Sequence, residues 1–211
     1  MIVIRELSLY IKMANTPIIS KDFYLNDDVI KLSQAFLGKS IETNINQKKT
    51  IGMIVETEAY AAPEDRASHA FENKITKRNK IMFADGGIAY VYLCYGIHTL
   101  FNIVTNKKSI PHAILIRAIE PLNGISIMEK RRSLSYSCNL TSGPGKLTQA
   151  LGISIEHNGL SLMGPEIIIR EYKKIPKNHI TASPRVGIEY AGKDVLNPWR
   201  FKISGNKWCS K

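Results

Sequence analysis

The chain has 211 residues, of which 44% are apolar, and this share supports a sizeable core and excludes a disordered chain. No apolar run approaches the roughly 18 residues that a membrane-spanning helix needs. The first residues also lack the pattern of a secretory signal, so we expect a cytoplasmic protein. The three cysteines have no paired spacing, which predicts free thiols and no zinc site.

The charge balance is strongly basic. Lys and Arg number 29 against 18 acidic residues, which gives a net charge of +11, and ten of these cations fall in residues 170–211. A positive field of this size favours a polyanionic partner such as nucleic acid, although it is also compatible with simple solubility. An anionic membrane surface is the weaker alternative, because no basic amphipathic helix is evident.

The first predicted elements are a helix and a hairpin. We treat residues 1–20 as an N-terminal extension of unknown role. A helix is predicted over 25–39, with Asn26 or Asp27 as its cap and Gly38 at its end. Strands follow at 40–45 and 49–60, joined by a turn around Asn46.

The remaining elements alternate between strands and helices. A short helix is predicted over 75–83, and further elements follow as strands at 88–94, 99–105, 113–119 and 166–171 and helices at 123–132 and 142–152. The strands are joined by turns too short for helical crossovers. We therefore predict one mixed α/β (α+β) domain over 21–211, with a mainly antiparallel curved sheet, surrounding helices and a protruding β-hairpin.

One strand end combines a carboxylate with aromatic residues. The strand "TIGMIV" leads into "ETEAYAAPEDRASHA", where alternation places Glu58 and Tyr60 on one face and the chain then bends toward His69. A desolvated carboxylate of this kind suits general acid or base catalysis. The alternative is an edge-strand Glu that pairs with an Arg and packs against the Tyr ring.

The stretch "AYVYLCYGIHTLFN" is a second candidate region. Tyr92 lies in the predicted strand, and Tyr95 falls where that strand must reverse, which exposes it and suggests stacking on bases or insertion into a duplex. A tyrosine-rich core strand is the alternative, and it explains Tyr95 poorly. Asn102 is either a satisfied buried amide or a pocket residue. Arg117, in the apolar run "AILIRAI", needs a partner, either Glu58 or a phosphate.

Taken together, these stretches resemble a known family. The blocks "IVETEAY", "PEDRASHA", "RNKIMF", "AYVYLCYGIHTLFNIV", "LIRAIEPL", "SGPGKLTQALGI" and "PRVGIEYAG" occur in the order typical of alkyladenine (3-methyladenine, methylpurine) DNA glycosylases. The resemblance runs from about residue 20 to the end of the chain and is closest to compact bacterial members. The chain departs from the family pattern at His98, where a Tyr is expected, and the region after Arg132 is shorter than in long members.

The resemblance implies a function for the candidate residues. Such enzymes flip damaged purines, such as 3-methyladenine, 7-methylguanine, hypoxanthine and ethenoadenine, out of duplex DNA and hydrolyse the N-glycosidic bond. Glu58 then corresponds to the general base, and Arg117 and the backbone of Val186 to groups that hold the water. The residues that bind the flipped base correspond to Tyr60, His69, Tyr92 and Asn102. The residue that intercalates into the DNA corresponds to Tyr95. The chemistry needs no metal or other cofactor, and we expect a nucleoid-associated monomer.

Two other classes of protein remain open. A non-catalytic damaged-DNA-binding protein would keep the pocket without the chemistry, but it would gain nothing from Glu58. A hydrolase of free nucleosides would need neither the basic C-terminal third nor Tyr95. Comparing a lesion in duplex DNA with the free nucleoside separates these possibilities from a DNA glycosylase.

Overall fold

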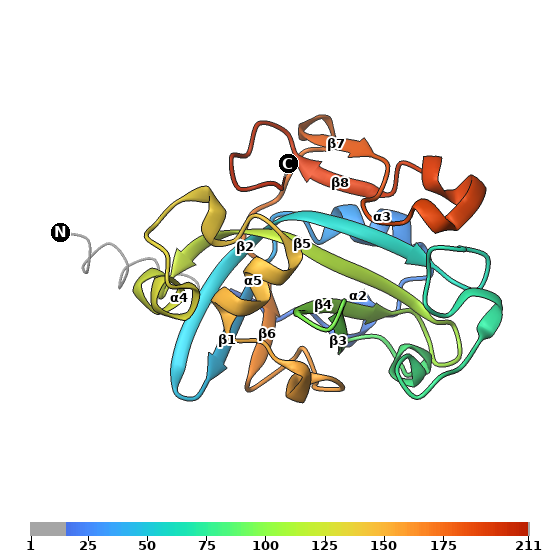
Figure 1. Cartoon of the computed structure of the whole chain (residues 1–211), viewed down its shortest axis with the longest axis horizontal. Helices are drawn as coiled ribbons and strands as arrows, with labels where there is room; N and C mark the ends of the chain where they lie inside the picture. Colours follow the sequence, from blue (N-terminus) through green and yellow to red (C-terminus); the bar gives the residue numbers. More distant parts are fainter. Residues whose placement is uncertain (1–15, 211) are drawn as a thin grey trace.

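The fold is known from a computed structural model, which describes residues 16–210. The chain forms one antiparallel sheet with helices packed on it (Figure 1). The strands lie in the order β3-β4-β5-β2-β1-β6, and β8 pairs with β2 and with β7. This arrangement confirms the predicted mixed α/β domain with a mainly antiparallel sheet.

The sheet is built around one long hairpin. β1 (Ser40–Ile45) and β2 (Lys48–Ala61) are joined by Asn46 and Gln47, which have φ of 53° and 59°. Two consecutive residues with positive φ form a turn whose twist matches that of the flanking strands, and Asn tolerates this conformation well. The predicted turn at Asn46 is therefore confirmed.

The other strands extend the sheet on both sides of β2. They are β3 (Ile88–Cys94), β4 (His98–Thr105), β5 (His112–Asn123), β6 (Ile167–Arg170), β7 (Ile180–Ser183) and β8 (Arg200–Ile203). β2 and β5 are the long strands that cross the molecule in Figure 1. The sequence analysis missed β7 and β8, each only four residues long. These two strands pair with each other, and β8 also pairs with β2, which is distant in sequence.

Bulges interrupt the pairing of β2 with β5. Ile54 pairs with Ile119 and Glu56 with Ala118, so Val55 is an extra residue in β2; Thr57 then pairs with Ile116, which leaves Arg117 as the extra residue in β5. A bulge changes the direction of side chains along a strand. Two opposed bulges therefore mark the place where β2 presents its carboxylates and β5 presents Arg117.

The first helical region is shorter than predicted. The helix predicted over 25–39 corresponds to α3 (Val29–Ala35), and a further short helix, α2 (Lys21–Tyr24), precedes it. The cap of α3 is Asp28, whose side chain accepts a hydrogen bond from the Lys31 N–H at 2.9 Å, and neither of the two predicted caps has this role. Asp28 satisfies a free N–H of the first turn, which fixes the start of the helix there.

The predicted helix over 75–83 is wrong in its first half. Residues 76–79 form a turn in which the Thr76 N–H donates to the Asn79 side chain at 2.7 Å, and only η2 (Lys80–Phe83), a 3-10 helix, follows. The buried Asn79 side chain also donates to the carbonyl oxygens of His69 and Lys74. These local hydrogen bonds compete with a regular helix.

The two later helices agree better with the sequence. α4 (Ile125–Arg132) follows Gly124, and α5 (Pro144–Leu151) begins with Pro at its first position and ends before Gly152 at φ 77°. Both ends of α5 follow the usual preference for Pro at the start and Gly past the end. Short 3-10 helices cover Phe71–Asn73, Cys138–Leu140, Ile155–His157, Lys177–His179 and Glu189–Leu196.

The core lies between the sheet and these helices. α3 packs on β2 and β5, and its Ser33 carbonyl accepts a hydrogen bond from the Thr57 hydroxyl at 2.9 Å. α5 contacts β4 and β5, and Thr148 donates to the Thr99 carbonyl at 2.7 Å. Because side chains alternate along β2, Thr57 faces α3 while Glu56 and Glu58 face the other side.

Most of the predicted N-terminal extension lies outside the described residues. Of its final part, Pro17 and Ile19 form backbone hydrogen bonds to Glu171 and Ile169, each at 2.9 Å, next to β6. The boundary of the domain at residue 21 stays a prediction. Over residues 16–210, no helix is long and apolar enough to cross a membrane.

Candidate active site

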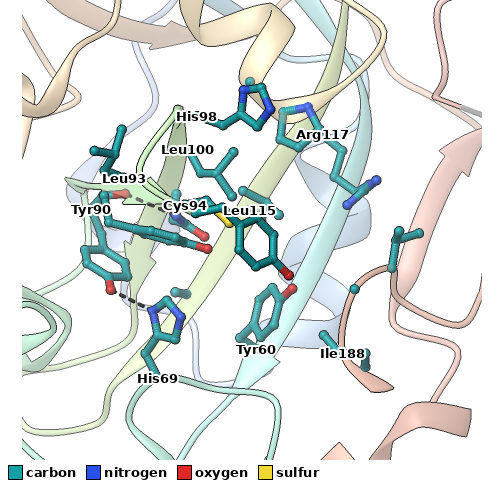
Figure 2. A pocket seen from close by; sticks show the side chains of 18 of the residues that line it. Tyr60, His69, Tyr90, Leu93, Cys94, His98, Leu100, Leu115, Arg117 and Ile188 are labelled. Carbon is teal, nitrogen blue, oxygen red and sulfur yellow. Dashed lines mark hydrogen bonds between the residues drawn. The ribbon is translucent and has the colours of Figure 1, made fainter. Parts of the chain in front are cut away.

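A cavity of about 710 Å³ opens between the end of β2, the β3–β4 hairpin and the start of α5 (Figure 2). The predicted site residues that line it are Tyr60, His69, Tyr92, Tyr95, Asn102, Arg117 and Val186. They come from four strands and three connecting segments. The fold therefore brings together residues that are spread over more than a hundred positions of the sequence, and the volume is typical of a small-molecule pocket.

The cavity has aromatic walls. The rings of His69 and Tyr92 lie 4.7 Å apart, and those of Tyr90 and Tyr92 lie 5.3 Å apart. The Tyr90 hydroxyl and His69 Nδ1 are 2.8 Å apart, the contact drawn in Figure 2. Tyr90 belongs to the core, because it is 2% exposed, but it also lines the cavity, a role the sequence analysis missed.

His69 is uncharged in this environment. Burial, followed by the nearby Arg78 guanidinium, lowers the pKa of His69 from 6.5 to about 4. Burial also raises the pKa of Tyr60 and Tyr92 above the ordinary value for tyrosine, so both phenols stay protonated at neutral pH. The walls therefore present neutral rings to whatever occupies the cavity.

Glu58 lies directly behind the cavity wall and is fully buried. Its Oε2 accepts a hydrogen bond from the Tyr60 hydroxyl at 3.0 Å, as expected for side chains on one strand face. Its Oε1 accepts from the Val186 N–H at 2.9 Å and lies 3.2 Å from an Arg117 guanidinium nitrogen. Three cavity-lining residues thus contact one carboxylate.

Arg117 bridges two carboxylates. Besides its contact with Glu58, its Nε donates to Glu56 Oε1 at 2.9 Å. Of the two candidate partners considered for Arg117, Glu58 is in contact with it, and Glu56 is an additional partner that the sequence analysis did not name. Burial disfavours the charge of Arg117, but the two carboxylates outweigh it and raise its pKa above the ordinary value.

Asn102 is both a buried amide with a hydrogen-bond partner and a residue of the pocket, the two alternatives considered from the sequence. It is 4% exposed, its amide donates to the Tyr90 carbonyl at 3.2 Å, and it also lines the cavity. The amide group is therefore held in a fixed orientation by a neighbouring strand.

Arg185 is a site residue that the sequence analysis missed. Its guanidinium lies 4.8 Å from the Tyr60 ring centre and 4.9 Å from that of Trp199, and it donates to Asp65 and to the Ala59 carbonyl. These contacts hold Tyr60 and also fix the segment that bears Val186. The signal was its place beside Val186 in "PRVGIEY", where an arginine falls between Pro and an apolar residue.

Tyr95 lies at the tip of the β3–β4 hairpin, as predicted. It is 87% exposed, and Tyr95 and Gly96 have φ of 49° and 74°. The Ile97 N–H donates to the Cys94 carbonyl at 3.1 Å, which closes a β-turn with Tyr95 and Gly96 at its centre, within the three-residue loop between Cys94 and His98. Glycine adopts a positive φ without steric cost, whereas the positive φ of Tyr95 raises its conformational energy.

The start of α5 forms another edge of the cavity. His98 lies against Gly145, where a Cβ atom would come within 3.2 Å of its imidazole nitrogen. His98 and Lys146 both line the cavity. Lys146 thus brings an amine to the cavity from α5, an element to which the sequence analysis gave no role in the site.

Arg78 was also missed. Its guanidinium carbon lies 4.5 Å from the centre of the Tyr92 ring, at cation–π distance, and it lines the cavity. It belongs to the block "RNKIMF", which the sequence analysis quoted without assigning it a role.

Between residues 16 and 210, no group of three or more His, Cys, Asp or Glu side chains is arranged to hold a metal ion. The three cysteines are free thiols, as predicted.

Comparison with known proteins identifies the family. The profile described as methylpurine-DNA glycosylase matches residues 22–207. The chain belongs to the methylpurine-DNA glycosylase family. A relative from Chlamydia felis is 49% identical over 189 residues, which is 89% of this chain and 96% of the relative. A Bacillus licheniformis relative is 42% identical over 190 residues, or 90% and 95% of the two chains, and both relatives are provisionally named 3-methyladenine DNA glycosylase.

Membership of the methylpurine-DNA glycosylase family confirms the resemblance seen in the sequence and the predicted enzyme class, a hydrolase of N-glycosyl bonds. The match starts at residue 22, close to the predicted start of the domain, and ends three residues before Ser210.

Proposed function

We propose that this glycosylase removes alkylated purines, with 3-methyladenine as the reference substrate, from duplex DNA in base-excision repair. The observation on which the proposal depends is the position of Glu58. It is fully buried behind an aromatic cavity and contacts Tyr60, Arg117 and Val186, all of which line that cavity.

The aromatic walls suit a base flipped out of the helix. A purine that leaves the stack loses stacking and pairing energy of roughly a few kcal/mol, which new stacking partners must offset. Tyr60, Tyr92 and His69 provide such partners. Tyrosine faces also attract cationic bases such as 3-methyladenine or 7-methylguanine, by on the order of 0.5–2 kcal/mol per contact. A neutral lesion such as hypoxanthine or ethenoadenine gains stacking but no such attraction.

Glu58 acts as the general base in this proposal. It takes a proton from a water molecule that attacks C1′ of the sugar as the bond to the purine nitrogen breaks. The positive charge that develops on the sugar is stabilised by the nearby carboxylate. Arg117 and the Val186 N–H orient that carboxylate, and Asn102 faces the base edge, where it would oppose the 2-amino group of guanine.

A duplex assay tests the proposal. Duplexes with one 3-methyladenine, 7-methylguanine, hypoxanthine or ethenoadenine are incubated with the protein and then treated with alkali, which cleaves the abasic sites. We expect strand cleavage at the lesion and none in undamaged duplexes. Binding without cleavage would indicate a damage-binding protein, and equal hydrolysis of the free nucleoside would indicate a nucleoside hydrolase. Either result would contradict the proposal.

The same proposal predicts the partner and the place of action. The net charge of +11 supports binding to the DNA backbone. Because DNA is the substrate, the bacterial nucleoid is the expected location. Action as a monomer also stays a prediction, which light scattering can check.

A further inference from the structure

A second buried carboxylate, Glu56, lies on the same face of β2 as Glu58, and the proposed reaction does not use it. Glu56 is 0% exposed. Its Oε1 accepts hydrogen bonds from Arg117 Nε at 2.9 Å and from Arg200 Nε at 2.7 Å. A buried carboxylate is stable only with such partners, and the loss of one partner leaves an uncompensated charge.

Ser210 completes the surroundings of Glu56. Its backbone N–H donates to Glu56 Oε2 at 2.5 Å, and its hydroxyl donates to Oε1 at 2.8 Å. The Ser210 carbonyl accepts from Arg200 at 3.2 Å and from Lys202 at 2.6 Å. Ser210 lies beyond residue 207, where the match to the family profile ends. We call Glu56, Arg200 and Ser210 the Glu56 cluster.

Glu56 and Glu58 contact different nitrogens of the same Arg117 guanidinium. Arg117 uses Nε for Glu56 and a terminal nitrogen for Glu58, at 2.9 and 3.2 Å. Because the guanidinium is planar, fixing Nε against Glu56 also fixes the direction in which the terminal nitrogen points. Burial acts to raise the pKa of Glu56, but Arg117, the Ser210 N–H and Arg200 outweigh it and hold the pKa below its ordinary value.

We propose that Glu56, held by Arg200 and Ser210, is a positioning residue that orients Arg117 toward Glu58. The segment at Ser210 thereby becomes part of the catalytic apparatus although it lies outside the cavity. This inference rests on the proposed function, in which Glu58 is the general base. The competing explanation is that the cluster only anchors the last residues of the sequence to the sheet.

The first test is Glu56→Gln in the full-length protein. The amide keeps the shape of the side chain and removes the charge that holds Arg117. We expect the single-turnover excision rate to fall about 10- to 100-fold, with the dissociation constant for an abasic-site duplex changed less than about 2-fold. Glu42→Gln is the matched control, because Glu42 on β1 is also buried and is paired with Lys49 on β2 at 2.7 Å and with Arg170 on β6 at 3.3 Å. It should destabilise the protein without slowing excision.

A second pair of variants addresses Ser210. Ser210→Ala keeps the backbone N–H and loses only the hydroxyl, whereas Ser210→Pro loses both donors to Glu56. We expect a rate loss below about 3-fold for the first and about 10-fold or more for the second. Equal, wild-type rates for both variants and for Glu56→Gln would overturn the inference.

A double-mutant cycle separates positioning from anchoring. Arg117→Lys replaces the planar group by a point charge that cannot hold the same bridge. If Glu56 acts through Arg117, adding Glu56→Gln to Arg117→Lys lowers the excision rate by less than about 2-fold more. If the cluster is only an anchor, the two rate losses multiply, and the inference is overturned. Thermal unfolding of each variant establishes that the rates refer to folded protein.

The result for Glu58 distinguishes this inference from the proposed function. If the wild-type protein cleaves none of the lesion duplexes, the proposed function fails, and the inference fails with it. If Glu58→Gln leaves excision intact, Glu58 is not the general base, and the inference fails although the excision function stands. If Glu58→Gln abolishes excision while Glu56→Gln behaves like Glu42→Gln, the proposed function stands and only the inference is overturned.

Discussion

The Glu58 carboxylate accepts hydrogen bonds from Tyr60 and Val186 and forms an ion pair with Arg117. These three partners line the cavity, whereas Glu58 lies behind them. Replacement by Gln preserves the size of the side chain but removes the proton acceptor. We expect Glu58→Gln to lower the single-turnover excision rate by about 10²- to 10⁴-fold, because this is the usual effect of losing general-base catalysis. Binding to lesion-containing duplex, measured by fluorescence anisotropy, should stay close to wild type. A wild-type excision rate would remove Glu58 from the proposed role.

The lowered pKa of His69 predicts how the stability of the protein depends on pH. Its pKa in the folded protein is about 4, below the ordinary 6.5 of the unfolded chain. Stability from the neutral imidazole is therefore fully present above about pH 6.5 and is lost as the pH falls toward 4, because only the unfolded chain takes up the proton. Between pH 7 and 5 this loss amounts to about 2 kcal/mol of unfolding free energy. Urea unfolding of wild type and His69→Gln at both pH values checks it, and a smaller pH dependence is expected for the variant.

Lys146 requires a prediction about the mode of cleavage. It lines the cavity, so an amine is present that could in principle attack the sugar after base loss. We predict that hydrolysis by water is the only reaction and that the enzyme has no lyase activity, because in the proposed mechanism the nucleophile is a water molecule activated by Glu58 and not an amine. Borohydride should trap no covalent adduct with DNA, and strand cleavage should need alkali. A trapped adduct that disappears in Lys146→Gln would show the opposite.

Among elements, the β3–β4 hairpin makes its own prediction. Tyr95 is 87% exposed at its tip, next to the cavity, and we propose that it fills the space that the flipped nucleotide leaves in the duplex. Stacking of this kind is worth roughly 1–3 kcal/mol. Tyr95→Ser should therefore weaken binding to an abasic-site analogue between about 5-fold and 100-fold or more, and binding to undamaged DNA much less.

The salt dependence provides the control for Tyr95. Contacts to phosphates give a log–log slope of about −0.9 per neutralised phosphate, and a hairpin tyrosine does not change that number. Tyr95→Ser should keep the slope of the wild type. Equal weakening of damaged and undamaged duplexes, or no weakening of either, would make Tyr95 an ordinary surface residue.

Some secondary-structure elements could be predicted from sequence patterns, and others could not. The turn at Asn46 and both ends of α5 were predictable because their residues have strong local preferences. The helix over 75–83 was wrong because Asn79 directs its side chain to backbone groups, a competition that apolar periodicity does not reveal. β8 was missed because a strand of four residues depends on its partner β2, which is more than a hundred residues away in sequence.

For the whole molecule, some contacts in the candidate site could be predicted from the sequence and others could not. The shared face of Glu58 and Tyr60 followed from alternation along one strand, and their hydrogen bond confirms it. The contacts of Arg185 with Tyr60 and of Arg117 with Glu56 depend on how distant segments meet. The opposed bulges at Val55 and Arg117 also leave no clear pattern in the sequence, because a bulge is a property of two paired strands.

The place of β2 within the sheet has a consequence for amide hydrogen exchange. Around Glu58 the strand is paired with β5 on one side and β8 on the other, so opening it locally means breaking two ladders. We expect the amides of residues 56–58 to exchange only through global unfolding, while those at Tyr95 and Gly96 exchange rapidly. Native-state exchange followed by mass spectrometry would show this contrast, and equal rates would contradict it. The proposed general base would then lie on the part of the chain that opens least often, and the proposed intercalating residue on one that opens readily.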